Sequence, residues 1–313
     1  MRETPRQPER WTVAIVVPTR NAARTIEACL TCARAQYDHL GAGVSVELIV
    51  VDNGSTDDTM RIAAALADRV LRAGPERSAQ RNVGARATAA DIVGFIDADQ
   101  LLDATVAAEV IDLLDRRPEV GPVVVPEVST GRGFWAGCRA LERRDSLGDT
   151  RSEAGRFFRR DVFLDAGGFD EALTGPEDWE LHDRLVAAGW PVGRTVAGVV
   201  HDEGVVRLGR CFAKKRYYGR SIPAYRSRPW ARARLFDPRR AVPAGAVARE
   251  PVRAAGLVVL KAVEGAGIAL GAASAGGSGF DHHEPVPAPG EKSPGTSSRS
   301  GGRPTTRGDV NIP

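Results

Sequence analysis

The chain has 313 residues, of which 27% are charged, so it can bury one large core or two half-domains. Its 43 Lys and Arg nearly balance its 40 Asp and Glu, and the net charge of +3 says little about its partners. The four Cys residues are scattered, which argues against a disulfide framework. A polar, proline-bearing N-terminus without an apolar signal region makes a cytoplasmic protein the expectation.

Strand and helix patterns alternate from the start of the chain. Residues 1–10 form a polar tail, and residues 12–19 are a continuous apolar run, which is typical of a parallel strand buried on both faces. The helix that follows, through Ala33, carries Cys29 on its apolar side. We therefore expect Cys29 to pack in the core rather than to form a redox or zinc pair with Cys32.

The next elements continue this alternation. They are a strand over 44–52, a helix capped by Ser55, a strand over 69–72, a helix over 77–90 and a strand over 91–97. Repeated alternation of this kind predicts a doubly wound, mostly parallel α/β sheet with helices on both faces. In such a sheet, ligands bind beyond the carboxyl ends of the strands.

After Pro118 the alternation loosens. The predicted elements are a strand over 123–128, a strand or strand-to-helix segment over 156–163, a turn at 167–170, a helix over 177–188 and a final strand over 195–200 that delivers His201.

The C-terminal part changes in composition. Residues 204–240 carry 12 Lys and Arg against one acid, Asp237, with Tyr and Trp interleaved. Residues 251–272 are apolar but interrupted by charges, so we expect a weakly amphipathic helix rather than a membrane span. From residue 274, Gly, Ser and Pro dominate, which predicts a disordered tail over 274–313.

Two acidic pairs carry the chemistry. Asp97 and Asp99 follow an apolar strand, where their carboxylates can present oxygens to a hard divalent cation that carries a diphosphate. Glu177 and Asp178 stand in the first turn of a predicted helix, where one of them can act as a base. A cation site with a separate base predicts an enzyme that transfers a group from a nucleotide-activated donor.

Five motifs, in order and spacing, resemble those of family 2 glycosyltransferases. They are residues 16–21 (VVPTRN), 50–57 (VVDNGSTD), 81–84 (RNVG), 95–99 (FIDAD), and 167–178 from Gly-Gly-Phe-Asp to Glu177-Asp178. The resemblance implies a GT-A fold and inverting transfer from a nucleotide sugar. It implies a glycosyltransferase domain over 11–220, made of a nucleotide-sugar half (11–125) and an acceptor half (126–220), with a basic and apolar helical extension over 221–273.

The resemblance also implies roles for single residues on the donor side. The residues implied to contact the nucleotide sugar are Pro18, Thr19, Asn21, Asp52, Arg81 and Asp97. Asp52 would accept from the base edge, and Arg81 would contact phosphate or base or form a surface salt bridge. Asp97 would face the ribose or a metal-bound water. Asp99 would ligate Mg²⁺ or Mn²⁺ bridging the diphosphate, with His201 as a third ligand or a structural residue.

On the acceptor side, Asp178 would take the proton from the acceptor hydroxyl, with Glu177 as the alternative base. Trp179 is interpreted as a wall of the acceptor pocket or as core. Two departures from the family are present. Gln100 stands where many relatives carry a third acid. No Gln-x-x-Arg-Trp motif and no long spans occur, so we expect a non-processive enzyme.

The basic stretch has three interpretations besides a solvated face. It can close over the diphosphate through Lys214, Lys215, Arg216 or Arg220. It can hold the protein at an anionic membrane surface, on the inner face of the membrane, where lipid-linked acceptors reside. Nucleic-acid binding is not expected, because no recognition fold is present.

Two alternative functions compete with transfer of a sugar to a sugar or lipid-linked acceptor. A non-catalytic nucleotide-sugar-binding module is disfavoured because Asp97, Asp99 and Asp178 are all present. A sugar nucleotidyltransferase would open with a Gly-rich loop after the first strand, and residues 18–21 (PTRN) are not one.

Overall fold

The first half of the chain alternates strands and helices as the sequence predicts. The computed structural model describes residues 10–41, 43–149, 152–229 and 248–275. The predicted tails, over 1–10 and 274–313, therefore lie almost wholly outside the described residues. The first elements are β1 (Thr12–Thr19), α1 (Ile26–Arg34), η1 (Ala35–His39), β2 (Ser45–Asp52), α2 (Thr59–Leu66), β3 (Arg69–Arg72), α3 (Arg77–Ala87) and β4 (Ile92–Phe95).

The second half is less regular. Its elements are β5 (Gln100–Leu102), α4 (Val106–Arg116), β6 (Pro122–Val124), β7 (Glu127–Arg132), α5 (Phe134–Asp145), β8 (Gly155–Arg159), α6 (Arg160–Asp165), α7 (Glu177–Ala187), β9 (Gly193–Arg194), β10 (Val199–Val205), α8 (Leu208–Gly219), α9 (Ile222–Arg226) and α12 (Pro251–Ser274). The segment predicted over 156–163 is a strand that passes directly into a helix.

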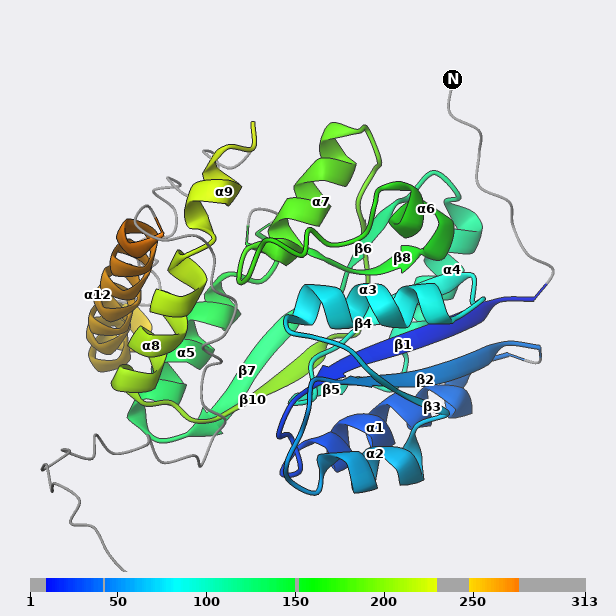
Figure 1. The fold of residues 1–313 in the computed structure, drawn as a ribbon, viewed down its shortest axis with the longest axis horizontal. Coiled ribbons are helices and arrows are strands. Elements are labelled where there is room, and N and C mark those ends of the chain that lie inside the picture. The colour runs from blue at the N-terminus through cyan, green and yellow to red at the C-terminus, as the bar shows by residue number, and fades with distance from the viewer. Residues whose placement is uncertain (1–9, 42, 150–151, 230–247, 276–313) are drawn as a thin grey trace, which may run out of the picture.

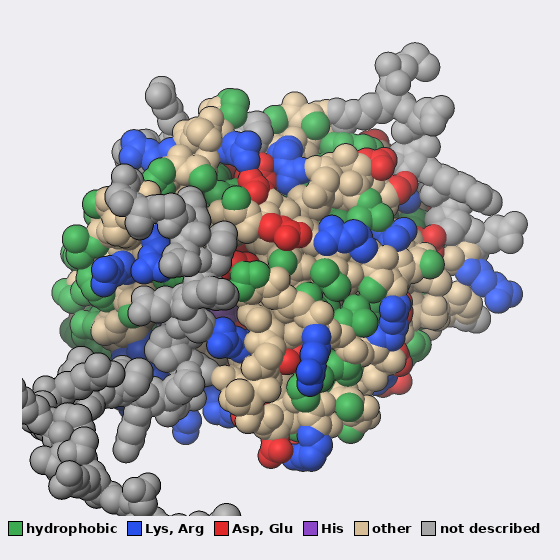
Figure 2. All heavy atoms as spheres, viewed as in Figure 1, with side chains coloured by type: hydrophobic (Ala, Val, Ile, Leu, Met, Phe, Trp, Pro, Cys, Tyr) green, Lys and Arg blue, Asp and Glu red, His purple; other side chains and the backbone are tan. Residues whose placement is uncertain are grey.

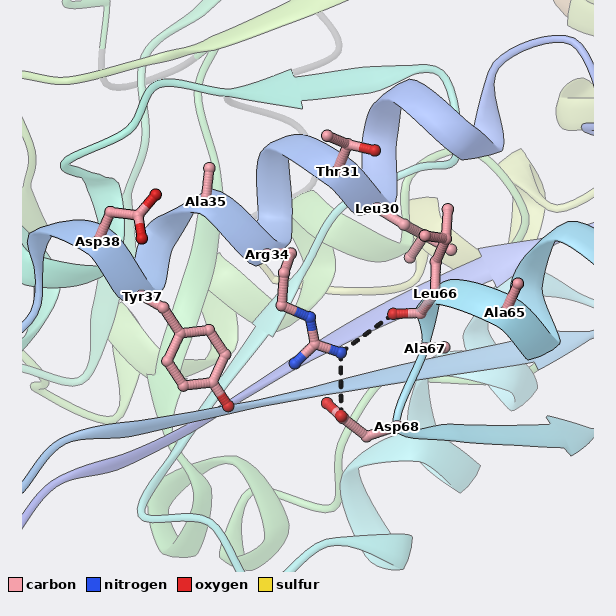
Figure 3. Close-up of a pocket in the computed structure, with 10 residues that line it drawn as sticks. All are labelled: Leu30, Thr31, Arg34, Ala35, Tyr37, Asp38, Ala65, Leu66, Ala67 and Asp68. Carbon is pink, nitrogen blue, oxygen red and sulfur yellow. Dashed lines mark hydrogen bonds and ion pairs between the residues drawn. The ribbon is translucent and has the colours of Figure 1, made fainter.

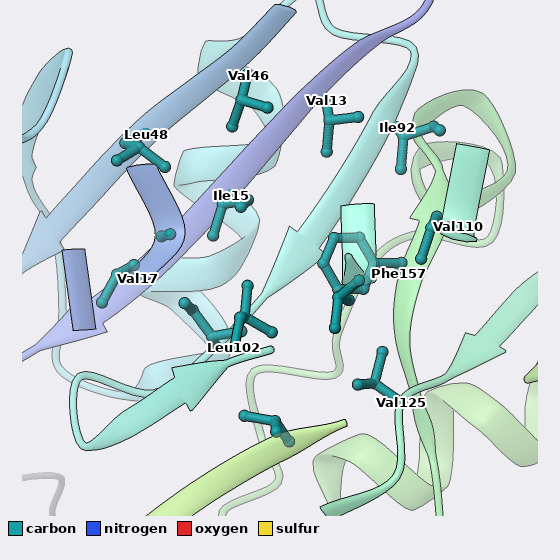
Figure 4. Packing of buried hydrophobic residues seen from close by; sticks show 14 of the residues in the cluster. Val13, Ile15, Val17, Val46, Leu48, Ile92, Leu102, Val110, Val125 and Phe157 are labelled. Carbon is teal, nitrogen blue, oxygen red and sulfur yellow. The ribbon is translucent and has the colours of Figure 1, made fainter. Parts of the chain in front are cut away.

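A seven-stranded sheet forms the centre of the molecule, in the order β3-β2-β1-β4-β8-β6-β9 (Figure 1). β1 runs parallel to both β2 and β4, whereas β8 runs antiparallel to β4 and β6. Apolar side chains on the two faces of β1 enter separate cores, one against α1, α2 and α4 and the other against α3, α6 and α7. Figure 4 shows the first of these cores, with Val13, Ile15 and Val17 along β1, Leu48 on β2 and Phe157 on β8. The mostly parallel α/β sheet with helices on both faces is confirmed.

A second sheet of three strands, β5-β10-β7, was not expected. The prediction of one strand over 123–128 is wrong, because β6 joins the large sheet and β7 joins the small one. Pro126, which cannot donate to a ladder, separates them. The predicted strand over 195–200 is also shifted. The N–H groups of Val196 and Ala197 donate to the Glu109 carboxylate instead of a neighbouring strand, and β10 begins only at Val199.

The predicted cap of the second helix is wrong too. α2 begins at Thr59, and Ser55 lies outside its first turn. The Ser55 backbone N–H and hydroxyl instead donate to the Asp52 carboxylate, which closes a turn at the end of β2. Ser55 therefore shapes the loop beside the predicted nucleotide site rather than the helix.

α5, α8 and α12 form a helical layer at one end of the molecule (Figure 1). The helix predicted over 251–272 is confirmed, and it lies close to α8 at positions without side chains. A Cβ atom at Gly271 would lie 2.0 Å from the Arg216 carbonyl oxygen, so this approach requires glycine. Charged residues of α5 and α12 pair with each other in what we call the helix cluster: Arg139, Glu142, Lys261 and Glu264.

Candidate active site

The loops after β1 and β2 lie side by side, because the two strands are parallel and in register from Thr12 to Thr19. Asn21 has a positive φ of 49° and fastens the loops together. Its backbone N–H donates to the Ser55 hydroxyl at 2.8 Å, and its side-chain oxygen accepts from the Thr56 N–H at 2.8 Å. Asn21 therefore holds the two loops together at this edge of the sheet.

Thr19 and Asp52 end these two strands, and both are buried. Both carboxylate oxygens of Asp52 accept hydrogen bonds from Ser55. Pro18 lies buried just before Thr19. The Thr19 hydroxyl has no hydrogen-bond partner among the described residues. A buried hydroxyl without a hydrogen-bond partner costs free energy, so Thr19 Oγ1 is available to form a hydrogen bond with a ligand.

A group of five charged residues, which we call the site cluster, lies beyond the carboxyl ends of β1 and β4. Arg81 on α3 is its centre, and its side chain is only 1% exposed. The guanidinium donates to Asp97 at 2.8 Å and to Asp178 at 2.7 Å. Arg77, one helical turn earlier, lies 3.3 Å from Asp97 and 3.1 Å from Glu177. The cluster joins the acids of two distant motifs.

These contacts change the interpretation of Arg81 and Asp97. Arg81 is buried between carboxylates, so the alternative of a surface salt bridge is wrong. Burial opposes ionisation of Asp97, but Arg81 and Arg77 outweigh it and hold the pKa of Asp97 well below its usual range. Each oxygen of Asp97 faces one of these two guanidinium groups. Asp97 thus lies beyond the end of β4, paired with Arg77 and Arg81, as an ionised group.

Glu177 and Asp178 have opposite surroundings although they are neighbours in α7. Glu177 is buried, lies against Arg77 and accepts a hydrogen bond from the Gly175 N–H. Burial raises the pKa of Glu177, and Arg77 offsets part of that rise. Asp178 has a side chain that is 41% exposed and contacts Arg81 through Oδ1. Its other oxygen is therefore the more accessible acceptor of this pair.

Asp99 and His201 meet where β5 and β10 pair. His201 lies opposite Gln100 in the ladder, and its Nε2 is 3.3 Å from Asp99 Oδ2. His201 is inside β10 rather than after the end of a strand as predicted. Burial disfavours its charged form, but hydrogen bonds to Asp99 and Glu127 outweigh burial and raise the pKa of His201 to about 10.

The donor set at this point suits a small divalent cation. Carboxylate oxygens are ligands for Mg²⁺ and Mn²⁺, whereas an imidazole nitrogen suits the transition metal Mn²⁺ better than the harder Mg²⁺. The Asp99 side chain is 42% exposed. Within the described ranges, no three His, Cys, Asp or Glu side chains are gathered as a ready metal site. Asp99 and His201 therefore fit as two protein ligands of a site that the diphosphate would complete. Asp97 faces arginines instead.

α8 brings part of the basic stretch to this site. Tyr218 lies 3.2 Å from the Arg77 guanidinium, and the Lys214 ammonium lies 5.7 Å from the centre of the same ring. Nearby Tyr218, Glu203 and Asp99 help to raise the pKa of Lys214. Lys215 instead reaches 4.0 Å from Glu264 on α12, and the Arg216 backbone is packed against α12. Lys214 is therefore better placed for a diphosphate than these two.

Trp179 lies on α7, directly after Asp178. Its indole N–H donates to the Ser152 carbonyl at 3.3 Å, and its side chain is partly buried. This contact fixes the loop before β8.

Sequence reasoning missed three residues: Arg77, Glu127 and Tyr218. Arg77 stood four positions before Arg81, and that helical spacing was a usable signal. Nothing local marked Glu127, because its partners Arg156 and His201 lie 29 and 74 positions away.

A hollow of about 680 Å³ lies elsewhere, between α1, η1 and α2 (Figure 3). Arg34 lies in it but already pairs with Asp68 at 2.9 Å and with the Leu66 carbonyl. This hollow is at the C-terminal end of α1, opposite the edge where β1 and β2 deliver Thr19 and Asp52. Its one cation, Arg34, is already paired and it lacks the acids described above, so we place the active site at the carboxyl edge.

Comparisons with known proteins agree with this geometry. Residues 14–167 match the family described as glycosyl transferase family 2. An uncharacterized glycosyltransferase of Mycobacterium tuberculosis (strain H37Rv) is 32% identical over 193 residues, which are 58% of this chain and 81% of that protein. The pre-mycofactocin glycosyltransferase of the same strain is 29% identical over 252 residues, with 69% of this chain and 48% of that protein covered.

Among solved structures, a mannosyltransferase from Pyrobaculum calidifontis in complex with GDP-Man and Mn²⁺ is similar in fold. It has a TM-score of 0.50 and 21% identity, and the match covers 84% of each chain. The chain is a GT-A enzyme that belongs to glycosyl transferase family 2.

Proposed function

We propose that the protein is a metal-dependent, inverting and non-processive glycosyltransferase that moves a sugar from a nucleotide-sugar donor to an acceptor hydroxyl. One observation carries the proposal. Arg81 joins Asp97, beside the nucleotide loops, to the half-exposed Asp178 on α7. A fixed acid with one accessible oxygen, next to the donor side of the site, is what a general base requires.

Donor binding would use the carboxyl edge of the sheet. Thr19 Oγ1 is the unpaired group available to the nucleoside, and Pro18 and Asn21 shape the loop around it. Asp52 remains a predicted contact to the base edge, through lone pairs not used by Ser55. Arg77 supplies positive charge beside Asp97 and Lys214 supplies it near Asp99, where the diphosphate would lie.

Asp99 and His201 would hold the cation, and Asp97 would face the ribose or a water bound to the cation. When bound, Mg²⁺ or Mn²⁺ supplies charge that stabilises the departing nucleoside diphosphate. Asp178 acts at the other side of the sugar. It accepts the acceptor's hydroxyl proton while the acceptor oxygen bonds to the anomeric carbon and the bond from that carbon to the diphosphate oxygen breaks. Configuration at the carbon is therefore inverted.

A donor screen tests the proposal. UDP-, GDP- and dTDP-sugars are incubated with the protein, with and without Mn²⁺, and the release of nucleoside diphosphate is measured. We expect release with one donor class and only with the cation, together with a product of inverted configuration by NMR. Tight donor binding without release, even when sugar and lipid-linked acceptors are supplied, would favour the non-catalytic module.

We also propose that the enzyme works at the cytoplasmic face of an anionic membrane, on a lipid-linked acceptor. Among the described residues, α12 is the one helix long and apolar enough to cross a membrane, with mean hydropathy 1.6. Two of its three charged residues, Lys261 and Glu264, face α5, and the third, Arg253, pairs with Glu250, whereas Val252, Val258, Val259 and Leu270 are exposed. This supports a helix that lies on the membrane surface.

Charge beside this apolar face points to an anionic surface. Residues 207–228, which form α8 and α9, contain eight Lys and Arg and no acid. Figure 2 shows hydrophobic side chains along the α12 edge with Lys and Arg groups beside them. Positive charge next to an apolar helix face is the pattern of proteins that bind anionic lipid head groups.

Binding to acidic vesicles tests the membrane proposal. The parent chain should bind at low salt and release as salt rises, because charge attraction is screened beyond about 8 Å at physiological ionic strength. Val258→Glu, at a position 55% exposed, should weaken binding. Val196→Glu is the control, since Val196 is 93% exposed on the loop before β10. A parent chain that ignores acidic vesicles would refute the proposal, and a salt-independent dimer lost in Val258→Glu would assign the face to a second copy.

A further inference from the structure

His201 lies between two carboxylates, one at each ring nitrogen. Nε2 is 3.3 Å from Asp99 Oδ2, and Nδ1 is 3.3 Å from Glu127 Oε1. A neutral imidazole carries its proton on one nitrogen and binds a cation only through the other. The proposed function uses Nε2 and gives no role to the contact at Nδ1.

Glu127 is held firmly at the start of β7. Its Oε2 contacts the Arg156 guanidinium and lies 3.4 Å from the Gln100 side-chain nitrogen. Its Oε1 lies 3.2 Å from Arg143 on α5. These contacts hold the carboxylate in place, with Oε1 3.3 Å from His201 Nδ1. The carboxylate is thus a fixed acceptor for the imidazole.

Gln100 connects this carboxylate to the acidic motif. Its side-chain oxygen accepts from the Asp97 backbone N–H at 2.9 Å and from Arg156 at 3.0 Å, while its nitrogen faces Glu127. An amide can accept at one end and donate at the other, whereas an ionised acid cannot donate. An acid at position 100 would also place a second negative charge beside Glu127. A neutral amide at position 100 is therefore compatible with a charged Glu127 beside it.

We propose that Glu127 is a positioning residue for the cation site: it accepts the Nδ1 proton of His201 and so leaves Nε2, on the side of Asp99, as the nitrogen that would bind the cation in place of a proton. The inference rests on the proposed function, because it assigns His201 to the divalent cation. Carboxylates that orient metal-binding histidines in this way typically contribute about 10- to 100-fold to metal affinity.

Mn²⁺ binding to the full chain, measured by EPR without donor or acceptor, tests the proposal. Glu127→Ala removes the acceptor at Nδ1 and should weaken Mn²⁺ binding by about 10- to 100-fold. Glu203→Ala is the matched control, because the Glu203 carboxylate lies 3.9 Å from the same nitrogen and outside hydrogen-bond reach. We expect Glu203→Ala to bind Mn²⁺ as the parent does.

A variant that keeps the charge covers the case in which Glu127→Ala fails to fold. Glu127→Asp retains a carboxylate for Arg143 and Arg156 but withdraws it from Nδ1, so Mn²⁺ binding should still weaken. If folded Glu127→Ala or Glu127→Asp binds Mn²⁺ as tightly as the parent, the positioning role is wrong and Glu127 serves only its arginine partners.

A double-mutant cycle with His201→Ala separates this inference from the proposed function. If Glu127 acts through His201, adding Glu127→Asp to His201→Ala should cause no further loss of Mn²⁺ affinity. Additive losses would overturn the inference while leaving His201 as a ligand. Parent-like Mn²⁺ affinity of His201→Ala would instead overturn the metal assignment, and the positioning role with it.

Discussion

The site cluster beyond β1 and β4 and the helix cluster between α5 and α12 are built from the same kinds of ion pair, yet they differ in balance and access. The helix cluster sets Arg139 and Lys261 against two glutamates and is neutral. The site cluster sets two arginines against three carboxylates. One of these carboxylates, Asp178, is half exposed.

This difference separates architecture from chemistry. A balanced cluster whose acids are mostly buried, as Glu142 and Glu264 are, fixes how two helices pack, since breaking it leaves a buried charge unpaired. A cluster with an extra acid and an opening to solvent can hold a cationic or proton-donating partner. Two clusters with the same kinds of ion pair can therefore have different roles, and their exposure and net charge indicate which role each has.

The largest expected effect is at the cation ligand. Asp99→Ala removes a carboxylate that lies outside both clusters, so transfer should be lost while the fold is retained, and excess EDTA should reproduce the loss in the parent. Nucleoside diphosphate release and circular dichroism are the measurements. Full activity in excess EDTA would contradict the assignment. Asp112→Ala, at an exposed acid on α4 paired with Arg116, is a control that should stay active.

The next effect is at the open acid of the site cluster. Asp178→Asn preserves shape but removes proton acceptance, so turnover should fall by about 10²- to 10⁴-fold while donor binding persists. Single-turnover kinetics and calorimetry of donor binding measure the two separately. Unchanged turnover would move the role to Glu177 or to solvent.

A matched pair of substitutions compares the stability of the two clusters. Arg81→Met leaves Asp97 and Asp178 without their shared partner and should cost about 3–5 kcal/mol in the free energy of unfolding. Arg139→Met should cost less, because Lys261 still pairs with both Glu142 and Glu264, whereas the cation that remains in Arg81→Met, Arg77, pairs with Asp97 and Glu177 but leaves the contact to Asp178 unreplaced. Urea unfolding measures both. An equal loss in the two variants would contradict the predicted difference, and a larger loss in Arg139→Met would show that the helix cluster is the more important for stability.

The smallest effect concerns pH. Burial disfavours the charge of Glu142, but Lys261 and Arg139 outweigh it and lower its pKa from 4.5 to about 2. A lowered pKa stabilises the folded state above the unfolded value, and this contribution is lost as pH falls from 4.5 towards 2. Glu142→Gln should therefore be less stable than the parent at pH 7, and the difference should shrink in acid. A constant difference across urea titrations at several pH values would contradict this.

Sequence patterns predicted the first half of the fold well and the second half poorly. β1 has the predicted bounds because an apolar run buried on both faces is a local signal. The edge strand β3 also has the predicted bounds, although none of its residues is buried. The split of 123–128 between two sheets and the late start of β10 depend on partners outside each segment. A pattern within one segment cannot show which sheet a strand joins.

The sequence by itself determined the family motifs and the places of Asp97, Asp99 and Asp178 within them, since order and spacing of residues are properties of the chain. Only the tertiary structure decided which acid is open and which cations hold the others. Arg77 meets Glu177 across 100 positions, and His201 meets Glu127 across 74. Exposure and charge pairing depend on such distant contacts, so they are set by packing and not by the local order of residues.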